Sequence, residues 1–179
     1  QLSYTPFNAT KSMKIFFLGI SGTFMGNLAQ IACELNHEVF GCDDKVYPPM
    51  SEELKSLGIN CSEGDEESNF KEADLYIIGN AISKENKLLQ KILKSNKNIT
   101  SGPKWLHDNI LSKKKVIAVS GTHGKTTVTT MISHALSKTG ISATYLIAEI
   151  PNSLQNSLTI SSSSLFVLDA DEYDHSHFT

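Results

Sequence analysis

Several features that would assign this chain to a common class are missing from its 179 residues. No apolar run approaches the ~20 residues of a membrane-spanning helix, so the sequence predicts no membrane partner. The net charge is −3 and no long basic block occurs, which argues against nucleic acid or an anionic membrane as the main partner. Hydrophobic content of 40% with 20% charged residues is that of an ordinary globular protein.

Cysteine is also scarce. Cys33, Cys42 and Cys61 show no C-x-x-C spacing, and an odd, scattered set is typical of reduced thiols in a cytoplasmic protein or of small buried apolar residues. Residues 1–12 lack a basic start followed by an apolar core, so they do not form a secretory signal. We expect these residues to be a disordered arm before a first strand that begins at Met13.

The most informative stretch runs from Val116 to Thr127. Apolar residues lead into the glycine turn Gly121-Thr-His-Gly-Lys-Thr-Thr127, which opens a helix and has the layout of a phosphate-binding loop. Lys125 would reach the terminal phosphates and the Thr126 hydroxyl would hold Mg²⁺. The common pattern has glycine at position 119, which is Val119 here, so the loop is unusually tight. A purely structural turn is the alternative interpretation.

A second glycine turn lies earlier in the chain. Residues 13–18 predict a buried strand, Gly19–Gly26 leads into a helix, and the strand at 37–43 ends in Asp43. This is the opening of a nucleotide-binding α/β unit, in which the acid accepts a hydrogen bond from a ribose hydroxyl or a base. Ser21 and Phe24 break the dinucleotide pattern G-x-G-x-x-G, which disfavours NAD but still allows a phosphate-bearing ligand. A structural turn remains the alternative here too.

The segment to residue 112 alternates strands and helices, which predicts a mainly parallel sheet covered on both faces. Ligands bind such sheets at the carboxyl ends of strands, and the loops after Leu18, Cys42 and Ile78 share that edge. Asn80 would therefore bind the same ligand as Ser21 and Asp43, unless it only caps its turn. We interpret Ser112–Lys115 as a linker between two domains.

The second domain starts at Val116 and looks incomplete. Val128, Met131, Ile132, Ala135 and Leu136 predict the buried stripe of the helix after the loop. Residues 141–148 predict a further strand, and the apolar strand 165–168 runs into the acidic Asp169-Ala-Asp-Glu-Tyr-Asp174. Proteins with a phosphate loop place a second metal carboxylate at such a strand end. Asp169 is our first choice for this ligand and Glu172 the second.

The combination resembles the Mur ligase family, ATP-dependent enzymes that add amino acids or peptides to UDP-N-acetylmuramate. The match rests on the early nucleotide-type domain, on G-T-H-G-K-T-T and on D-A-D-E-Y-D, and it covers nearly all of residues 13–174. Four segments, at 19–26, 46–50, 78–81 and 101–108, are similar to the branch that acts in peptidoglycan recycling with L-alanyl-γ-D-glutamyl-meso-diaminopimelate as the amine. The branch that adds L-alanine is the alternative.

The resemblance implies a fold and a set of site residues. The fold would be α/β: a Rossmann-like, parallel-sheet UDP-sugar domain at 13–112, followed by the start of a central P-loop ATPase domain at 116–179. ATP and Mg²⁺ would be the cofactors, UDP-N-acetylmuramate and a peptide or amino acid the substrates, and Lys125 the catalytic residue. The ATP-binding residues would be Gly121, Thr122, His123, Gly124, Lys125, Thr126 and Thr127. The UDP-sugar would be bound by Gly19, Ser21, Gly22, Thr23, Gly26, Asp43 and Asn80.

Two departures from the family pattern stand out. The family usually has glutamate at the position of Asp169, and a glycine pair beside the sugar nucleotide at the position of Ala148-Glu149. Two further hypotheses stay open at this point. One is a fragment that binds a UDP-sugar without catalysis; the other is a P-loop kinase or nicotinamide oxidoreductase, against which Val119 and the broken glycine pattern count.

Overall fold

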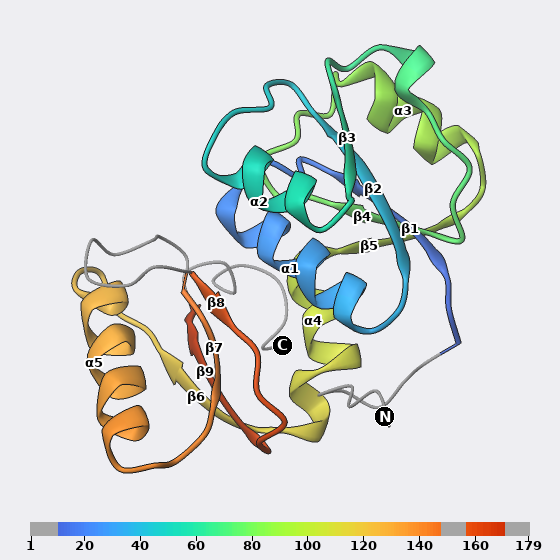
Figure 1. Ribbon diagram of the computed structural model, residues 1–179. Coiled ribbons are helices and arrows are strands. Elements are labelled where there is room, and N and C mark those ends of the chain that lie inside the picture. The colour runs from blue at the N-terminus through green and yellow to red at the C-terminus, as the bar shows by residue number, and fades with distance from the viewer. Residues whose placement is uncertain (1–10, 148–156, 171–179) are drawn as a thin grey trace. The chain divides into compact units, whose positions relative to one another are not determined.

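The computed structural model describes residues 11–147 and 157–170, and it divides the chain into two compact units between Trp105 and Leu106 (Figure 1). We call them the N-terminal unit and the C-terminal unit. The predicted domain limits, 13–112 and 116–179, put the division some residues later. Helix α4 (Gly102–Asn109) spans the observed division, and the 3-10 helix η2 (Leu111–Lys113) and strand β6 (Lys115–Val119) directly follow it, in place of the expected Ser112–Lys115 linker.

The N-terminal unit is built on a five-stranded, all-parallel sheet in the order β3-β2-β1-β4-β5, as the alternation of strands and helices predicted. Its elements are β1 (Lys14–Leu18), α1 (Thr23–Glu34), β2 (Glu38–Asp43), α2 (Met50–Ser56), β3 (Asn60–Glu63), the 3-10 helix η1 (Glu67–Asn69), β4 (Leu75–Ile78), α3 (Lys87–Lys94) and β5 (Asn98–Ser101).

The two faces of this sheet pack against different helices, because side chains alternate along β1. Phe16 and Leu18 lie in one buried cluster with Tyr76 and with the apolar side of α3. Phe17 points to the other face, where its ring meets Trp105 edge to face at 6.4 Å between centroids. The predicted stripe of α1 is confirmed: Leu28, Ile31, Ala32 and Leu35 are all buried. This core holds rigid the strand ends that carry the first candidate site.

The C-terminal unit carries a four-stranded sheet in the order β6-β9-β7-β8. Its further elements are α5 (Lys125–Lys138), β7 (Thr144–Leu146), β8 (Leu158–Thr159) and β9 (Leu165–Asp169). Strand β9 is parallel to both β6 and β7, whereas β8 runs antiparallel to β7. The sequence predicted neither β8 nor the shortness of β7, which covers three residues of the eight expected at 141–148.

The predicted buried stripe of α5 is wrong. Val128 is 45% exposed and Met131 65% exposed, while the fully buried helix positions among the described residues are Thr129 and Ser133. The reason is the place of β6 at the edge of its sheet, where Val116 and Ile117 are also exposed. Among residues 11–147 and 157–170, sheet lies on only one side of β6, so the apolar side of α5 has no partner surface there.

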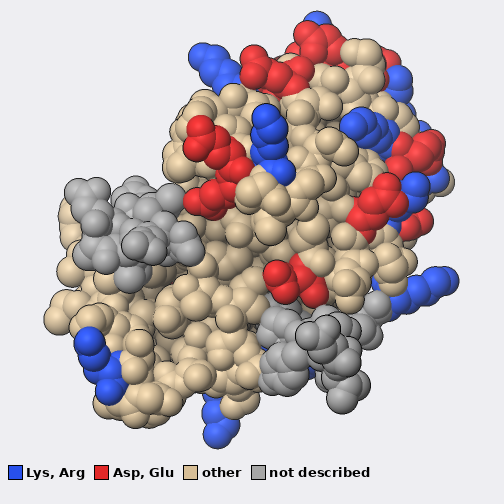
Figure 2. All heavy atoms as spheres, in the orientation of Figure 1, with Lys and Arg blue, Asp and Glu red and all other residues tan. Residues whose placement is uncertain are grey.

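The surface of the molecule agrees with its small net charge. Figure 2 shows lysine and acidic side chains interspersed over the upper and right part of the face in view, whereas its lower left carries only a few lysines. Within the two described stretches, no helix combines the length and the apolar character that crossing a membrane requires. Cys33, Cys42 and Cys61 are free thiols, as the spacing of the cysteines suggested.

Candidate functional site

The glycine turn that the sequence analysis proposed as a phosphate-binding loop lies between β6 and α5, and we keep the name phosphate loop for it. Gly124 is the residue that caps α5, and it has φ 76°, a left-handed conformation that a side chain would disfavour. The helix then begins at Lys125, with Thr126 and Thr127 in its first turn. The first backbone N–H groups of a helix have no partner within it, and the helix dipole adds a partial positive charge there. The loop and helix start therefore form a suitable anion site.

The strand register brings the expected metal residues together. Val119, the last residue of β6, pairs with Asp169, the last residue of β9. The Thr126 hydroxyl donates a hydrogen bond to Asp169 Oδ2 at 2.9 Å, across 43 residues of sequence. Two oxygen-bearing side chains from separate elements thus meet beside the glycine turn, and these are the two residues that the sequence analysis proposed as ligands of one metal ion.

The other oxygen of Asp169 tests whether this pair suits a metal ion. Asp169 is only 5% exposed, and its Oδ1 atom is buried without a hydrogen-bond partner. A buried, unsatisfied carboxylate oxygen is costly unless a cation or a donor reaches it. Mg²⁺ prefers hard oxygen ligands and keeps several waters, so a hydroxyl and one carboxylate fit it well.

A larger metal cage is not seen. No group of three or more histidine, cysteine, aspartate or glutamate side chains comes together within residues 11–147 and 157–170. Glu172, the second choice for the metal ligand, lies outside the described residues, as does Ala148-Glu149. The described part of the site therefore offers two neighbouring side-chain oxygen groups, the Thr126 hydroxyl and the Asp169 carboxylate.

Lys125 folds back over the loop. Its Nζ donates to the Gly121 carbonyl oxygen at 2.6 Å, which keeps the ammonium group above the turn. Thr122, His123 and Thr127 are exposed around it. All seven predicted ATP-binding residues thus lie in one loop and the first turn of α5.

The second candidate site lies at the carboxyl edge of the N-terminal sheet. Leu18 at the end of β1 pairs with Cys42 of β2 on one side and with Ile78 of β4 on the other. The residues that follow these strand ends are therefore neighbours. A Cβ atom on Gly19 would lie 3.8 Å from the Gly79 Cα atom, which shows how closely the turns after β1 and β4 approach each other.

Ser21 and Asp43 are in direct contact. The Ser21 backbone N–H donates to Asp43 Oδ2 at 2.8 Å. The Ser21 side chain is buried, with the residue 5% exposed, and its hydroxyl has no hydrogen-bond partner. Gly22 caps α1 and Thr23 begins it, so both stand at a helix N-terminus beside these residues. Asn80 lies exposed in the turn after β4.

Gly26 has a packing role in this structure. It lies within α1, and a Cβ atom there would overlap the Met50 side chain at the start of α2. Gly102 is similar, since a Cβ atom on it would lie 2.9 Å from Met25 Sδ. Two glycines of the motifs therefore allow close packing around α1, in addition to any contact that Gly26 makes with a ligand.

Cys42 lies next to this site but is chemically quiet. Its thiol donates to the Gly64 carbonyl oxygen at 2.8 Å. Burial, reinforced by the negative charges of Asp43 and neighbouring acids, raises the pKa of Cys42 to about 11. The thiol therefore stays protonated at neutral pH and is a poor nucleophile.

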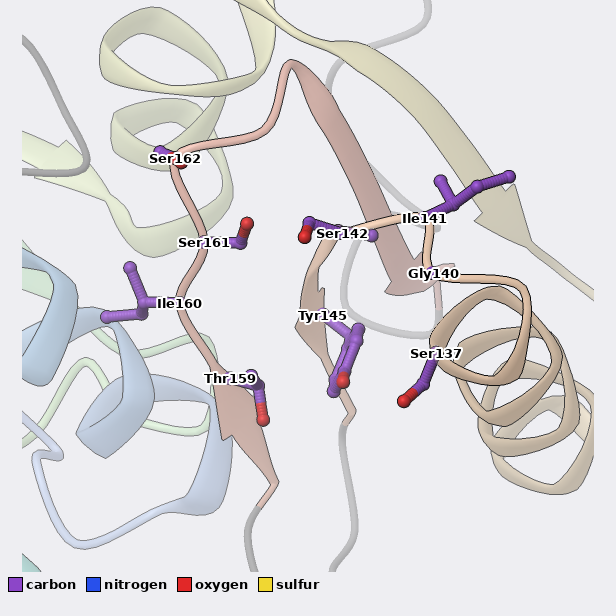
Figure 3. A pocket seen from close by; sticks show the side chains of 10 residues that line it. Ser137, Gly140, Ile141, Ser142, Tyr145, Thr159, Ile160, Ser161 and Ser162 are labelled. Carbon is purple, nitrogen blue, oxygen red and sulfur yellow. The ribbon is translucent and has the colours of Figure 1, made fainter.

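A further pocket lies at the far end of α5 from the phosphate loop (Figure 3). It has a volume of about 460 Å³, and it is lined mainly by hydroxyl side chains from the end of α5, from β7 and from the segment after β8. A 14-residue helix is about 21 Å long, which separates this pocket from Lys125. Sequence reasoning did not find the pocket, because its serines and threonines form no spaced motif.

Comparison with known proteins adds to this geometry. The model of the Mur ligase family, catalytic domain, matches residues 14–114, and that of the Mur ligase middle domain matches residues 119–175. The UDP-N-acetylmuramate–L-alanyl-γ-D-glutamyl-meso-2,6-diaminoheptandioate ligase of Escherichia coli is 44% identical over 93% of this chain. A UDP-N-acetylmuramate–L-alanine ligase of Clostridium botulinum is 32% identical, also over 93% of the chain.

A solved structure gives the same result. The UDP-N-acetylmuramate:L-alanyl-γ-D-glutamyl-meso-diaminopimelate ligase from Neisseria meningitides superposes with a TM-score of 0.84 at 40% identity. The match covers 94% of this chain and 55% of that one. The chain spans only about a third of the length of the two curated relatives, 36% in each case.

Proposed function

The chain belongs to the Mur ligase family, and from that premise we propose that it is part of a cytoplasmic, ATP-dependent amide ligase that acts on UDP-N-acetylmuramate. The observation that carries the proposal is the Thr126–Asp169 contact at the mouth of the phosphate loop, where a hydroxyl and a buried carboxylate leave one oxygen unsatisfied. This pair suits the magnesium ion of a nucleotide, and the family match supplies the reaction class.

The reaction would proceed in two transfers. The carboxylate of the sugar's lactyl group attacks the γ-phosphorus of ATP, giving an acyl phosphate and ADP. The amine of the incoming substrate then attacks the acyl carbon, an amide bond forms, and phosphate leaves. Both steps depend on positioning and on neutralising charge, which a preorganised loop provides.

Individual residues would divide these tasks. The backbone N–H groups at the start of α5 would bind the nucleotide phosphates, and Lys125 would move from the Gly121 carbonyl oxygen to the migrating phosphoryl group. Thr126 and Asp169 would hold Mg²⁺, which when bound neutralises phosphate charge. The N-terminal unit would bind the UDP part at the edge that carries Ser21 and Asp43.

The amine substrate is best proposed as the tripeptide L-alanyl-γ-D-glutamyl-meso-diaminopimelate. Identity is 44% to a ligase named for this peptide and 32% to one named for L-alanine, over equal shares of this chain. The second candidate function is binding of the UDP-sugar without turnover. The share of the relatives' length that this chain spans favours it for the 179 residues taken alone.

A Lys125→Ala variant tests the proposal. In an enzyme extended to the relatives' full length, the variant should lose peptide-dependent phosphate release by a factor of a thousand or more, because the cation that balances the transferring phosphoryl group is gone. UDP-N-acetylmuramate should bind with unchanged affinity in calorimetry. Equal loss of sugar binding and turnover would refute the assignment of two separate sites.

The 179-residue chain gives a second result. We expect it to bind UDP-N-acetylmuramate and to release no phosphate with ATP and peptide. Measurable turnover by this chain alone would exclude the non-catalytic interpretation.

A further inference from the structure

The pocket of about 460 Å³ at the far end of α5 lies outside both candidate sites (Figure 3). It belongs entirely to the C-terminal unit. Tyr145 of β7 pairs with Thr159 of β8, and directly opposite residues of an antiparallel pair point to the same face of a sheet. Ser137, near the end of α5, lines the pocket as well, and Figure 3 shows Tyr145 between Thr159 and Ser137. Side chains from a helix and two strands thus surround one hollow.

The wall of the pocket that follows β8 is held in place by hydrogen bonds. The hydroxyl of Thr144, a fully buried residue of β7, accepts from the Ser161 N–H at 3.0 Å and donates to the Ser161 carbonyl oxygen at 3.1 Å. The Ser161 hydroxyl in turn accepts from the Ser163 N–H at 3.2 Å. The Lys114 ammonium group donates to the Ser163 carbonyl oxygen at 2.5 Å. Because this wall is preformed, a ligand would bind without first ordering the chain.

The lining offers several hydroxyl groups that the protein itself does not use. Within residues 11–147 and 157–170, no protein group forms a hydrogen bond with the side chains of Ser137, Ser142, Tyr145, Thr159 or Ser162. Each hydroxyl can both donate and accept, so the set can match a ligand that carries donors and acceptors side by side.

The pocket has no charged lining. None of its lining residues is acidic, basic or a histidine. Its place at the C-terminal end of α5 adds a partial negative charge from the helix dipole, which disfavours an anion. A metal ion prefers carboxylate, imidazole or thiolate ligands, which the lining lacks. The ligand that fits is therefore neutral and rich in hydrogen-bonding groups.

We propose that this pocket is a second ligand site and that it binds a neutral saccharide. The hydroxyls at the edge of a sugar ring match the unused hydroxyls of the lining, and the C–H groups on its face can pack on the ring of Tyr145. The volume lies within the range of about 300–1,000 Å³ that is typical of small-molecule sites. The site is independent of the proposed function, because its charge disfavours the nucleotide that the phosphate loop would bind.

NMR titration of the 179-residue chain tests the class of ligand. Glucose, N-acetylglucosamine and its β-1,4-linked dimer are the neutral probes, N-acetylglucosamine 6-phosphate is the charged one, and uridine is a neutral ring of another class. At least one neutral sugar should shift the amide signals of Ser142, Tyr145 and Thr159 saturably, with a Kd of about 1 mM. The 6-phosphate should bind at least about threefold more weakly than N-acetylglucosamine, because of the helix dipole.

Three results would overturn the proposal. The first is the absence of saturable shifts at these residues with all three neutral sugars up to about 50 mM. The second is equal or tighter binding of uridine at the same residues, which would refute the saccharide as the ligand class. The third is equal or tighter binding of the 6-phosphate, which would refute the argument from charge.

Two variants in one serine run place the ligand in the pocket. Ser162→Ala removes a lining hydroxyl, whereas Ser164→Ala is the matched control, since Ser164 is also exposed and does not line the pocket. Ser162→Ala should weaken the sugar about threefold, as expected for one neutral hydrogen bond, and Ser164→Ala should change its affinity by less than about 1.5-fold. Tyr145→Leu should weaken it about tenfold, because the aromatic face is lost. Equal effects of Ser162→Ala and Ser164→Ala would show that the sugar binds elsewhere.

Discussion

A Thr126→Val substitution tests the contact on which the phosphate site depends. Valine has nearly the shape of threonine but lacks the hydroxyl that donates to Asp169 Oδ2 at 2.9 Å. Asp169 is only 5% exposed, and its Oδ1 atom already lacks a hydrogen-bond partner. In the variant Oδ2 loses its donor as well, so both oxygens of a buried carboxylate are left without the Thr126 hydroxyl or a replacement. A hydrogen bond to a charged group contributes about 1.5–3 kcal/mol, so we expect a loss of about 2 kcal/mol in the free energy of unfolding.

Repeating the Thr126→Val substitution in an Asp169→Asn variant shows how much of the hydrogen-bond energy comes from the negative charge of Asp169, because asparagine has nearly the same shape as aspartate but no charge. The asparagine oxygen can still accept from Thr126, but the bond is now between neutral groups and is worth about 1 kcal/mol. Thr126→Val should therefore cost about 1 kcal/mol less in this background than in wild type, a coupling that a double-mutant cycle resolves. Asp169→Asn alone should raise the free energy of unfolding by about 1 kcal/mol without Mg²⁺, because an unsatisfied buried charge is removed.

Urea denaturation at 25 °C in the presence of a chelator measures these differences. Circular dichroism follows both units, while the single tryptophan, Trp105, is buried beside Phe17 and reports the N-terminal unit by fluorescence. Thr127→Val is the matched control for stability, since Thr127 is exposed on the same helix turn and should change stability by less than about 0.5 kcal/mol. If Thr126→Val behaved like this control, the hydrogen bond to Asp169 would not exist in solution and the metal site would lose its support.

Three further predictions concern other parts of the molecule. Gly26→Ala should lower the free energy of unfolding, measured by urea denaturation, by about 1 kcal/mol or more, because the new methyl group overlaps the buried Met50 side chain. Adding Met50→Ala to the Gly26→Ala variant should restore part of this loss. The pKa of His37 is lowered from its ordinary value of 6.5 by burial, so the unfolded chain takes up the proton more readily. The free energy of unfolding should therefore fall as the pH drops below about 6.5, and a His37→Gln variant with the same slope would contradict this. Ile117, 36% exposed on the edge strand β6, should promote self-association through that edge. Ile117→Lys should therefore lower self-association in analytical ultracentrifugation more than the control Leu93→Lys, which alters a residue 59% exposed on the helix α3.

Much of the fold could be predicted from local patterns. The strand–turn–helix units around Gly19 and Gly121, the buried stripe of α1 and the acid at the end of β2 all follow from short-range periodicity and turn chemistry. The parallel sheet follows as well, because alternating strands and helices force crossover connections. The family could also be identified, since its motifs are contiguous in sequence.

The stripe of α5 shows where such reasoning fails. Helical periodicity identifies which residues share a face, but burial also requires a partner surface. Val128 and Met131 have the right spacing and remain exposed, because β6 lies at the edge of its sheet. Strand β8 was missed for a related reason: a two-residue strand has no period of its own and exists only through its pairing with β7.

By itself, the sequence determined the residue types of the phosphate loop, the helix that follows it and the acid of the candidate site, because each depends on neighbours along the chain. Only the tertiary structure decided that Asp169 pairs in register with Val119 and accepts from Thr126, since strand register is set by contacts between distant segments. It also decided that one oxygen of Asp43 is taken up by the Ser21 backbone. A backbone N–H is present at nearly every residue and leaves no mark in the sequence, so this contact could be found only in three dimensions.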